Sequence, residues 1–432
     1  MNTNQWKKLL SDSSMDSTLE KLYGNNKKNV QVQKERYSNA VEQFEKLYGD
    51  NREISIYSAP GRTEIGGNHT DHNLGIVVAA AVTVDVLCIA SKNDTGIINT
   101  CSCNFKEIKP IDTNSLEKRT EETESTEGLI RGICAGIINH GGRCGGLDLY
   151  VDSNVLQGSG LSSSAAFEVA ISATINYEFC DKMFNSTQLA QISQYAENEY
   201  FGKPSGLMDQ MASSTGSLMT IDFQDIKMPI VTPIAFDLDA YNLALCVVNS
   251  GASHADLTED YASIKRDMCS VANVFCKQHL REVSYDTFIN HMSYLREQVG
   301  DRGVLRAMHF YLECDRAIAI RKAIEENDIE KFLQKIIESG HSSFEYNQNA
   351  YTSKAPESQP VSVALCAAQS FLQNKRGAWR LQGGGFAGTI QCFVDKAIVA
   401  EFIAEMEKLL GENCCQVLSI RNYGAIKVSE NI

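Results

Sequence analysis

The 432-residue chain lacks an apolar run long enough to cross a bilayer. Its longest apolar stretch, residues 76–90, is interrupted by Thr83 and Asp85 and is typical of a buried strand. The first fourteen residues show neither a long apolar stretch nor a cleavage signature, so we do not expect secretion. The sequence therefore predicts a cytoplasmic protein without a membrane partner.

Positive charge is also scarce, because 40 Lys and Arg residues face 54 Asp and Glu residues, for a net charge of −14. This balance disfavours nucleic acid as a partner, since a phosphate backbone needs clustered cations. An anionic nucleotide would have to be held by backbone dipoles, a metal and a few local cations. The fourteen cysteines lack zinc-ligand spacing, so we expect reduced, mostly buried thiols.

One stretch, residues 156–173 (LQGSGLSSSAAFEVAISA), indicates a phosphate site. Its glycines allow a close backbone approach, and a helix that starts after them points N–H groups at an anion. The three serines, Ser162–Ser164, could reach phosphate oxygens or Mg²⁺. A serine that merely caps the helix is the simpler alternative, but two glycines and three serines exceed what a cap needs. The stretch is neither a Walker loop, which needs Gly-Lys-Ser/Thr, nor a dinucleotide fingerprint, which needs a third glycine.

Two further segments supply candidate catalytic groups. Residues 59–75 (APGRTEIGGNHTDHNLG) place Arg62 between glycines, and residues 202–213 (GKPSGLMDQMAS) hold one acidic residue, Asp209, in a Gly-flanked apolar context. Phosphoryl transfer needs positioning, charge neutralisation and a base. Asp209 is the candidate base, and Arg62 is the candidate cation that steadies it and the transferred group. Each residue, taken alone, could equally be a helix cap or a structural ion pair.

Four further residues are weaker candidates for the site. His69 and Asp71, two residues apart, could bind a polyol or form a tight polar turn. Glu197 at the end of a predicted helix, residues 187–201, could ligate Mg²⁺ or lie on a solvated face. Tyr261 could cover a sugar or belong to the core. These alternatives stay open on residue type alone.

Three separated motifs, PGRTEIGGNHTDHNLG, GSGLSSSAA and LQGGGFAGT, make the chain resemble the galactokinases. These belong to the kinase superfamily named for galactose, homoserine, mevalonate and phosphomevalonate. The resemblance implies an α+β fold with an N-terminal ribosomal-protein-S5-like domain, a C-terminal α+β domain and an active site in the cleft between them. We expect a helical extension over residues 1–51, read as two helices, and kinase domains over 52–230 and 231–432.

The resemblance implies ATP-dependent phosphorylation of the anomeric hydroxyl of galactose, which gives α-galactose 1-phosphate and opens the Leloir pathway. ATP and Mg²⁺ are the implied cofactors, and the expected state is a monomer or a weak homodimer. Arg62 and Asp209 match the catalytic pair, and Glu197 with Ser163 or Ser164 matches the metal ligands. The implied sugar site contains Glu64, Asn68, His69, Asp71, Gly206 and Tyr261, and the implied ATP loop contains Gly158, Ser159, Gly160, Leu161, Ser162, Ser163 and Ser164.

Three departures lie in the sugar motif. The family usually has Glu where this chain has Asn68, Asn is common where it has Glu64, and His72 replaces a Tyr. The family's carboxylate is expected to bind the C6 hydroxyl, so an amide at residue 68 would tolerate a different C6 group. Galactose is therefore the leading substrate, and galacturonate, arabinose or a 2-amino-galactose is the alternative. A non-catalytic galactose sensor is disfavoured, because the serine run is complete and both catalytic residues are present.

Overall fold

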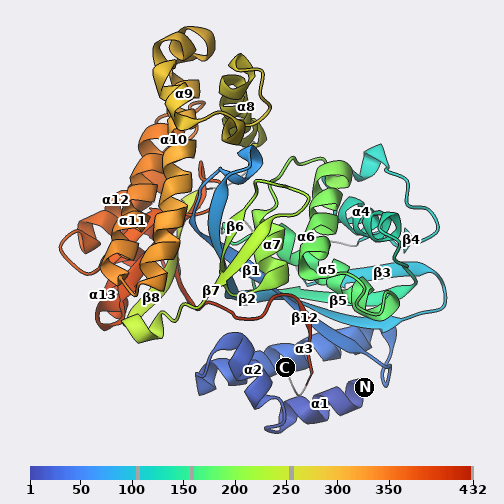
Figure 1. The fold of residues 1–432 in the computed structure, drawn as a ribbon. Coiled ribbons are helices and arrows are strands. Elements are labelled where there is room, and N and C mark those ends of the chain that lie inside the picture. Colours follow the sequence, from blue (N-terminus) through green and yellow to red (C-terminus); the bar gives the residue numbers. More distant parts are fainter. Residues whose placement is uncertain (104–107, 156–159, 253–256, 430–432) are drawn as a thin grey trace.

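A long antiparallel pair of strands, β1 and β2, organises the first half of the chain in the computed structural model (Figure 1). β1 spans Ser55–Gly66 and β2 spans Ile76–Lys92. In the described residues, 1–103, 108–155, 160–252 and 257–429, six shorter strands complete a sheet ordered β12-β1-β2-β5-β3-β4, with β6 on β2 and β7 on β6. The six are β3 (Ile97–Ser102), β4 (Ile111–Asp112), β5 (Leu147–Ser153), β6 (Leu218–Asp222), β7 (Ile230–Ile234) and β12 (Ile426–Lys427).

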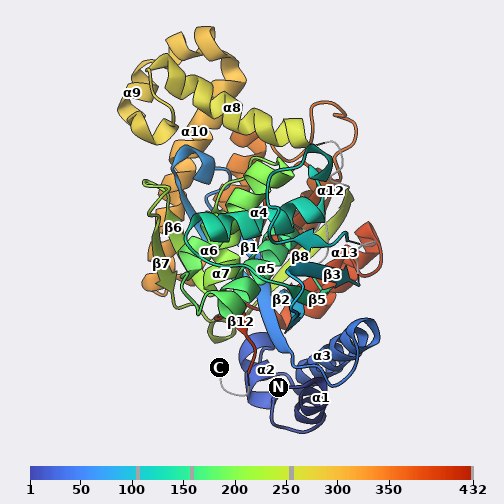
Figure 2. The ribbon, with the colours of Figure 1, turned by 90° about the vertical axis from the view of Figure 1, so that its right-hand side faces the viewer.

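Helices cover both faces of this sheet. Tyr57 and Cys88 belong to a core cluster shared with α4 and α5, whereas Ile56 and Leu87 belong to a cluster shared with α1, α2 and α3. Because both faces are buried, β2 can be apolar at nearly every position, as residues 76–90 are. Figure 2 shows α1–α3 gathered at one end of the molecule. The helices are α1 (Thr3–Ser11), α2 (Asp16–Tyr23), α3 (Lys27–Tyr48), α4 (Thr126–Asn139), α5 (Ser163–Phe179), α6 (Ser186–Tyr195) and α7 (Met208–Thr215).

The second sheet has four strands in the order β11-β8-β10-β9, and it is also covered on both faces. Ala244 and Cys246 of β8 belong to the cluster with α12 and α13, and the alternate residues Leu243 and Leu245 to the cluster with α10 and α11. Gly300, with φ +78°, breaks the helical run of α10. The elements are β8 (Leu243–Ala252), β9 (Gly377–Leu381), β10 (Gly388–Asp395), β11 (Cys415–Leu418), α8 (Thr258–Val274), α9 (Tyr285–Asn290), α10 (Met292–Glu325), α11 (Ile329–Ser342), α12 (Pro360–Leu372) and α13 (Val399–Leu410).

The two sheets share apolar core. Ile65 of β1 and Phe393 of β10 belong to the same cluster of buried side chains. The chain also crosses back at its end, where Lys427 of β12 pairs with Tyr57 of β1. The expected α+β fold is confirmed, with two sheets, while the expected division into two kinase domains stays a prediction. β7, which begins at the expected boundary near residue 230, still pairs with β6 in the first sheet.

The N-terminal segment forms three helices rather than the two that the repeated LEKLYG/FEKLYG pattern predicted. Both copies of the pattern do end as expected, at Gly24 (φ +89°) and Gly49 (φ +93°), because positive φ suits glycine. The extra helix is α1, which begins at a capping box formed by Asn2 and Gln5. Within the described residues no helix combines the length and apolarity needed to cross a bilayer.

A buried cluster of charges joins these helices to the sheet. Asp85 of β2 accepts hydrogen bonds from Arg36 of α3 at 2.6 Å and from Tyr23 of α2 at 2.6 Å. Arg421, near the C-terminal end, reaches the same carboxylate at 3.1 Å. Asp85 and Arg421 are essentially inaccessible to solvent. One carboxylate therefore ties the N-terminal helices, the sheet and the returning C-terminal segment together.

Candidate active site

Arg62 and Asp209, which are 147 positions apart in the sequence, meet in a bidentate ion pair. Arg62 Nε donates to Asp209 Oδ1 at 2.7 Å, and Nη2 donates to Oδ2 at 2.8 Å. Arg62 comes from β1 and its side chain is 7% exposed, whereas Asp209 comes from the first turn of α7 and its side chain is 30% exposed. Burial opposes the charge on Asp209, but Arg62 outweighs it and lowers the pKa of this carboxyl. Asp209 is therefore an ionised group that remains accessible.

The loop that leads into Ser162–Ser164, called the serine loop from here on, ends beside the Arg62–Asp209 pair. Ser162 donates from Oγ to Asp209 Oδ2 at 2.6 Å, and the backbone N–H of Arg62 donates to Leu161 O at 2.9 Å. Ser162 has a left-handed backbone (φ +60°) and does not cap α5 with its side chain, so the simpler helix-cap alternative is wrong for this residue. Arg62 Nη1 also donates to Gly160 O. The predicted loop residues Gly158 and Ser159 lie outside the described residues.

The third glycine motif, residues 381–389, approaches the serine loop from the C-terminal half of the chain. A Cβ on Gly160, whose φ is +67°, would lie 2.8 Å from Thr389 Oγ1, and one on Gly383 would lie 3.4 Å from Gly160 O. The ring of Tyr261, from α8, lies 2.6 Å from the Cβ position of Gly384, and its hydroxyl donates to Gly385 O at 3.0 Å. Glycine is needed here because two loops and a ring approach each other closely. All three predicted motifs thus converge.

The sugar motif places His69 and Asp71 beside these loops. Burial lowers the pKa of His69 to about 4, so the ring is neutral, and its Nε2 lies 2.9 Å from Gly384 O. Burial and the nearby charge of Asp209 raise the pKa of Asp71 to about 6. A Cβ on Gly206 would lie only 1.6 Å from Asp71 Oδ2, so residue 206 must be glycine for this carboxylate to keep its place. His69, Asp71, Gly206 and Tyr261 therefore form one group of neighbours around Asp209 and the third glycine motif.

Glu64 and Asn68 lie next to each other, and both side chains form hydrogen bonds with protein groups. Arg380 of β9 donates to Glu64 Oε1 at 2.5 Å, and Asn68 Nδ2 donates to Glu64 Oε1 at 3.0 Å and to Gly383 O at 2.7 Å. Asn349 donates to Asn68 Oδ1 at 2.9 Å. Both side chains are buried, with Asn68 0% exposed. Their sugar-binding roles stay a prediction, and the hydrogen bonds that they make are to protein groups.

Two family models match the chain, "Galactokinase galactose-binding signature" over residues 42–92 and "GHMP kinases N terminal domain" over residues 128–217. A galactokinase of Mannheimia succiniciproducens is 30% identical over 387 residues, an alignment that covers 86% of this chain and 91% of that protein. The chain belongs to the galactokinase family. The first match begins inside α3, so part of the expected extension 1–51 lies within the region that the galactokinase signature covers.

Another galactokinase agrees with this membership, and solved structures share the fold. A galactokinase of Streptomyces coelicolor is 28% identical, over 82% of this chain and 88% of that protein. The structure of Lactococcus lactis galactokinase complexed with galactose matches with a TM-score of 0.78 at 22% identity, over 90% of this chain and 98% of that chain. An L. major mevalonate kinase matches with a TM-score of 0.57 at 13% identity, over 86% and 97%. These structural likenesses show the common fold.

The magnesium ion that the galactokinase family implies fits the oxygen atoms around Glu197. This residue lies in η3 (Ala196–Phe201), a π-helix that continues α6 where the sequence predicted one regular helix over 187–201. Its carboxylate is 3% exposed, and Ser164 Oγ lies 3.4 Å from Oε1. The described residues contain no group of three His, Cys, Asp or Glu side chains placed to hold a metal. One carboxylate and a hydroxyl, completed by nucleotide phosphates, is a set that suits Mg²⁺. Ser163 is the first residue of α5, and its metal role stays a prediction.

Sequence reasoning missed several residues of the site. Gln210 donates from Nε2 to Glu197 Oε2 at 2.9 Å and to Glu168 Oε2 at 3.0 Å, and Lys203 lies 2.7 Å from Glu197 Oε1. Arg380, in the strand before the third glycine motif, neutralises Glu64. The lysine between two glycines in GKPSG was a signal that could have been followed. Arg380 and Glu168 had no comparable signal, because they look like ordinary strand and helix residues.

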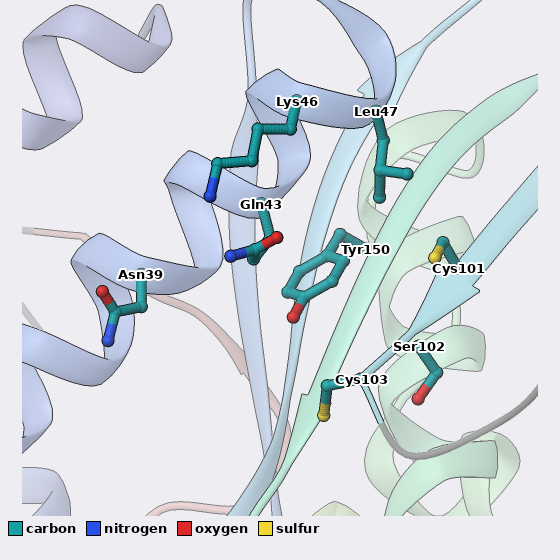
Figure 3. Close-up of a pocket in the computed structure, with 8 residues that line it drawn as sticks. All are labelled: Asn39, Gln43, Lys46, Leu47, Cys101, Ser102, Cys103 and Tyr150. Atoms are coloured by element: carbon teal, nitrogen blue, oxygen red, sulfur yellow. The ribbon is translucent and has the colours of Figure 1, made fainter.

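A separate hollow of about 620 Å³ opens between α3 and the neighbouring strands β3 and β5 (Figure 3). In Figure 3 the ring of Tyr150 lies between the side chains of α3 and those of Cys101 and Cys103. None of the residues predicted for catalysis, sugar or nucleotide lines it. Its lining is Asn39, Gln43, Lys46, Leu47, Cys101, Ser102, Cys103 and Tyr150.

Proposed function

We propose that this chain transfers the γ-phosphoryl group of ATP to the anomeric hydroxyl of galactose in the cytoplasm, with Mg²⁺ as the metal. The contact that carries the proposal is the Arg62–Asp209 pair, which touches both the serine loop and the sugar motif. It rests further on membership of the galactokinase family. A metal held by Glu197 and Ser164 would neutralise phosphate charge.

Asp209 orients the sugar hydroxyl and accepts its proton in this proposal. Because Arg62 lowers the pKa of Asp209, the carboxylate is a weak base. A weak base suffices, since phosphoryl transfer proceeds through a loose transition state in which positioning and charge stabilisation dominate. Arg62 holds the carboxylate in place through two hydrogen bonds and supplies positive charge next to the transferred group.

The first experiment measures ADP release on galactose with the wild-type chain and with Asp209→Asn. We expect kcat to fall by about 100-fold or more while galactose binding is retained, because the amide keeps the shape but not the charge. Asp181→Asn is the matched control, since that side chain is 96% exposed. A kcat near the wild-type value in Asp209→Asn would exclude Asp209 as the catalytic group.

The second experiment decides between sugars. ADP release is compared for galactose, galacturonate, arabinose and 2-amino-galactose at equal concentrations. The proposal expects the highest kcat/KM for galactose. Negligible turnover of galactose with strong turnover of another of these sugars would keep the chemistry and change the substrate. Sugar and ATP binding without turnover of any of them would instead support a sensor.

A further inference from the structure

Lys203 is a charged side chain of the active site that the proposed reaction has not used. It lies in the short connection, residues 202–207, between η3, which carries Glu197, and α7, which carries Asp209. Its Nζ lies 2.7 Å from Glu197 Oε1, and its side chain is 51% exposed. Burial opposes the charge, but the Glu197 carboxylate outweighs it and raises the pKa of Lys203. A half-exposed cation therefore lies beside Glu197.

The ammonium group of Lys203 contacts one of the two carboxylate oxygens of Glu197, Oε1. The other oxygen, Oε2, accepts hydrogen bonds from Ser205 Oγ at 2.5 Å and from Gln210 Nε2 at 2.9 Å. Oε1 is the oxygen that faces Ser164 of the serine loop, and Lys203 is on that same oxygen. Lys203 thus neutralises the oxygen to which a metal between Glu197 and Ser164 would bind, so the two cations compete for it.

The serine loop needs a cation that it does not itself contain. Residues 156–166 include neither Lys nor Arg, unlike a Walker loop, where a lysine follows the glycines. Arg62 is committed to Asp209 and Gly160 O. Lysine has a flexible stem and a compact charge, so a half-exposed ammonium can change partners at low cost. Lys203 is therefore well placed to serve a polyanion that enters between the serine loop and Glu197.

We propose that Lys203 is a phosphate-binding cation that changes partners: it holds Glu197 when nucleotide is absent and binds the terminal phosphate of ATP when nucleotide is present. This proposal rests on the proposed function only in taking ATP as the nucleotide. The alternative is a fixed ion pair that merely braces the connection between η3 and α7. The two differ in what happens to metal and to nucleotide when the lysine charge is removed.

The experiment compares Lys203→Met with wild type in two binding assays that need no turnover. Mn²⁺ binding to the nucleotide-free protein is measured by electron paramagnetic resonance, and binding of ATP without metal, in EDTA, is measured by calorimetry. We expect Mn²⁺ to bind about 3- to 10-fold more tightly, because its competitor is gone, and ATP to bind about 10-fold more weakly. Lys203→Arg should retain ATP binding.

Tighter Mn²⁺ binding together with weaker ATP binding supports the proposal. Loss of a purely structural ion pair would instead weaken the binding of both ligands. Parallel weakening, or no change in either constant, overturns it. Lys408→Met is the matched control, because Lys408 also forms an exposed pair with a glutamate, Glu405, and both constants should stay at wild-type values. The proposed function is tested separately: wild-type protein that binds ATP but phosphorylates no sugar would remove the kinase assignment without deciding the role of Lys203.

Discussion

The side-chain amide of Asn68 donates to both carboxylate oxygens of Glu64, at 3.0 and 3.3 Å. The galactokinase sugar motif usually carries the reverse arrangement, with an amide at the first position and a carboxylate at the second. The two departures of this chain are therefore in direct contact, and we expect them to be coupled. Arg380, which is fully buried, balances the displaced carboxylate. The pair keeps one carboxyl group, on residue 64 instead of residue 68.

Asn68→Glu should destabilise the protein by about 3 kcal/mol or more, because it places a second carboxylate against Glu64 in a buried site. The double variant Glu64→Asn/Asn68→Glu should recover at least half of that loss. Urea denaturation of the two single variants and the double variant measures the coupling. Equal losses in the single Asn68→Glu and the double variant would show that the exchange is not coupled.

The double variant also tests the role of residue 68 in substrate choice. If this side chain faces C6, the double variant should shift relative kcat/KM towards galactose over galacturonate. Both sugars are measured at the same ATP concentration, with Glu64→Asn as the matched control. Unchanged relative kcat/KM would remove residue 68 from the sugar contacts and leave it a structural role.

Gly206→Ala should raise KM for the sugar by about 10-fold or more with little change in ATP binding. The new methyl group would lie 1.6 Å from Asp71 Oδ2, so either the carboxylate or the backbone must move. Steady-state kinetics with galactose and calorimetry with ATP separate the two effects. A variant with wild-type KM would show that Asp71 does not contact the sugar.

The pH dependence of sugar binding should follow Asp71. Burial raises the pKa of this carboxyl to about 6, whereas Arg62 keeps the pKa of Asp209 below its usual range. As pH falls from 7 to 5, Asp71 gains a proton and loses its ability to accept sugar hydroxyls, while Asp209 stays ionised. We expect kcat/KM for the sugar to decline below pH 6, by about 10-fold per pH unit at the acid end. In Asp71→Asn, kcat/KM for the sugar should be lower than in wild type and independent of pH over this range. If kcat/KM still declines below pH 6 in this variant, the titrating group is not Asp71.

Asp85→Ala should lower the free energy of unfolding by about 3–5 kcal/mol, because Arg36 and Arg421 would both lose a buried partner. Urea denaturation measures the loss, and Asp181→Ala at an exposed position is the control. Burial opposes the charge on Asp85, but these two arginines lower its pKa. Its contribution should therefore persist at neutral pH and disappear only as pH falls below the usual aspartate range. A loss under 1 kcal/mol would show that the cluster does not hold the N-terminal helices.

The sequence predicted the parts of the site whose chemistry is local. Glycines and serines in short order indicate a backbone conformation and a set of donors wherever they occur, so the serine loop was found directly. Ser162 was expected to bind phosphate or Mg²⁺, or to cap the helix, but in the structure its hydroxyl donates to Asp209, which is 47 positions away. Arg380 was not predicted, because a single basic residue in a strand carries no pattern until a carboxylate lies beside it.

The sequence by itself determined the α+β fold class, the strand–loop–helix segments and the kind of chemistry, since periodicity and motif spacing act over a few residues. Only the tertiary structure decided which carboxylate each cation neutralises, that Asn68 faces Glu64, and that the N-terminal helices join the sheet through Asp85. The physical reason is that charge pairing and burial depend on distances in space. Residues 62 and 209 meet only when α7 packs against the first sheet, and residues 64 and 380 meet only when the two sheets come together.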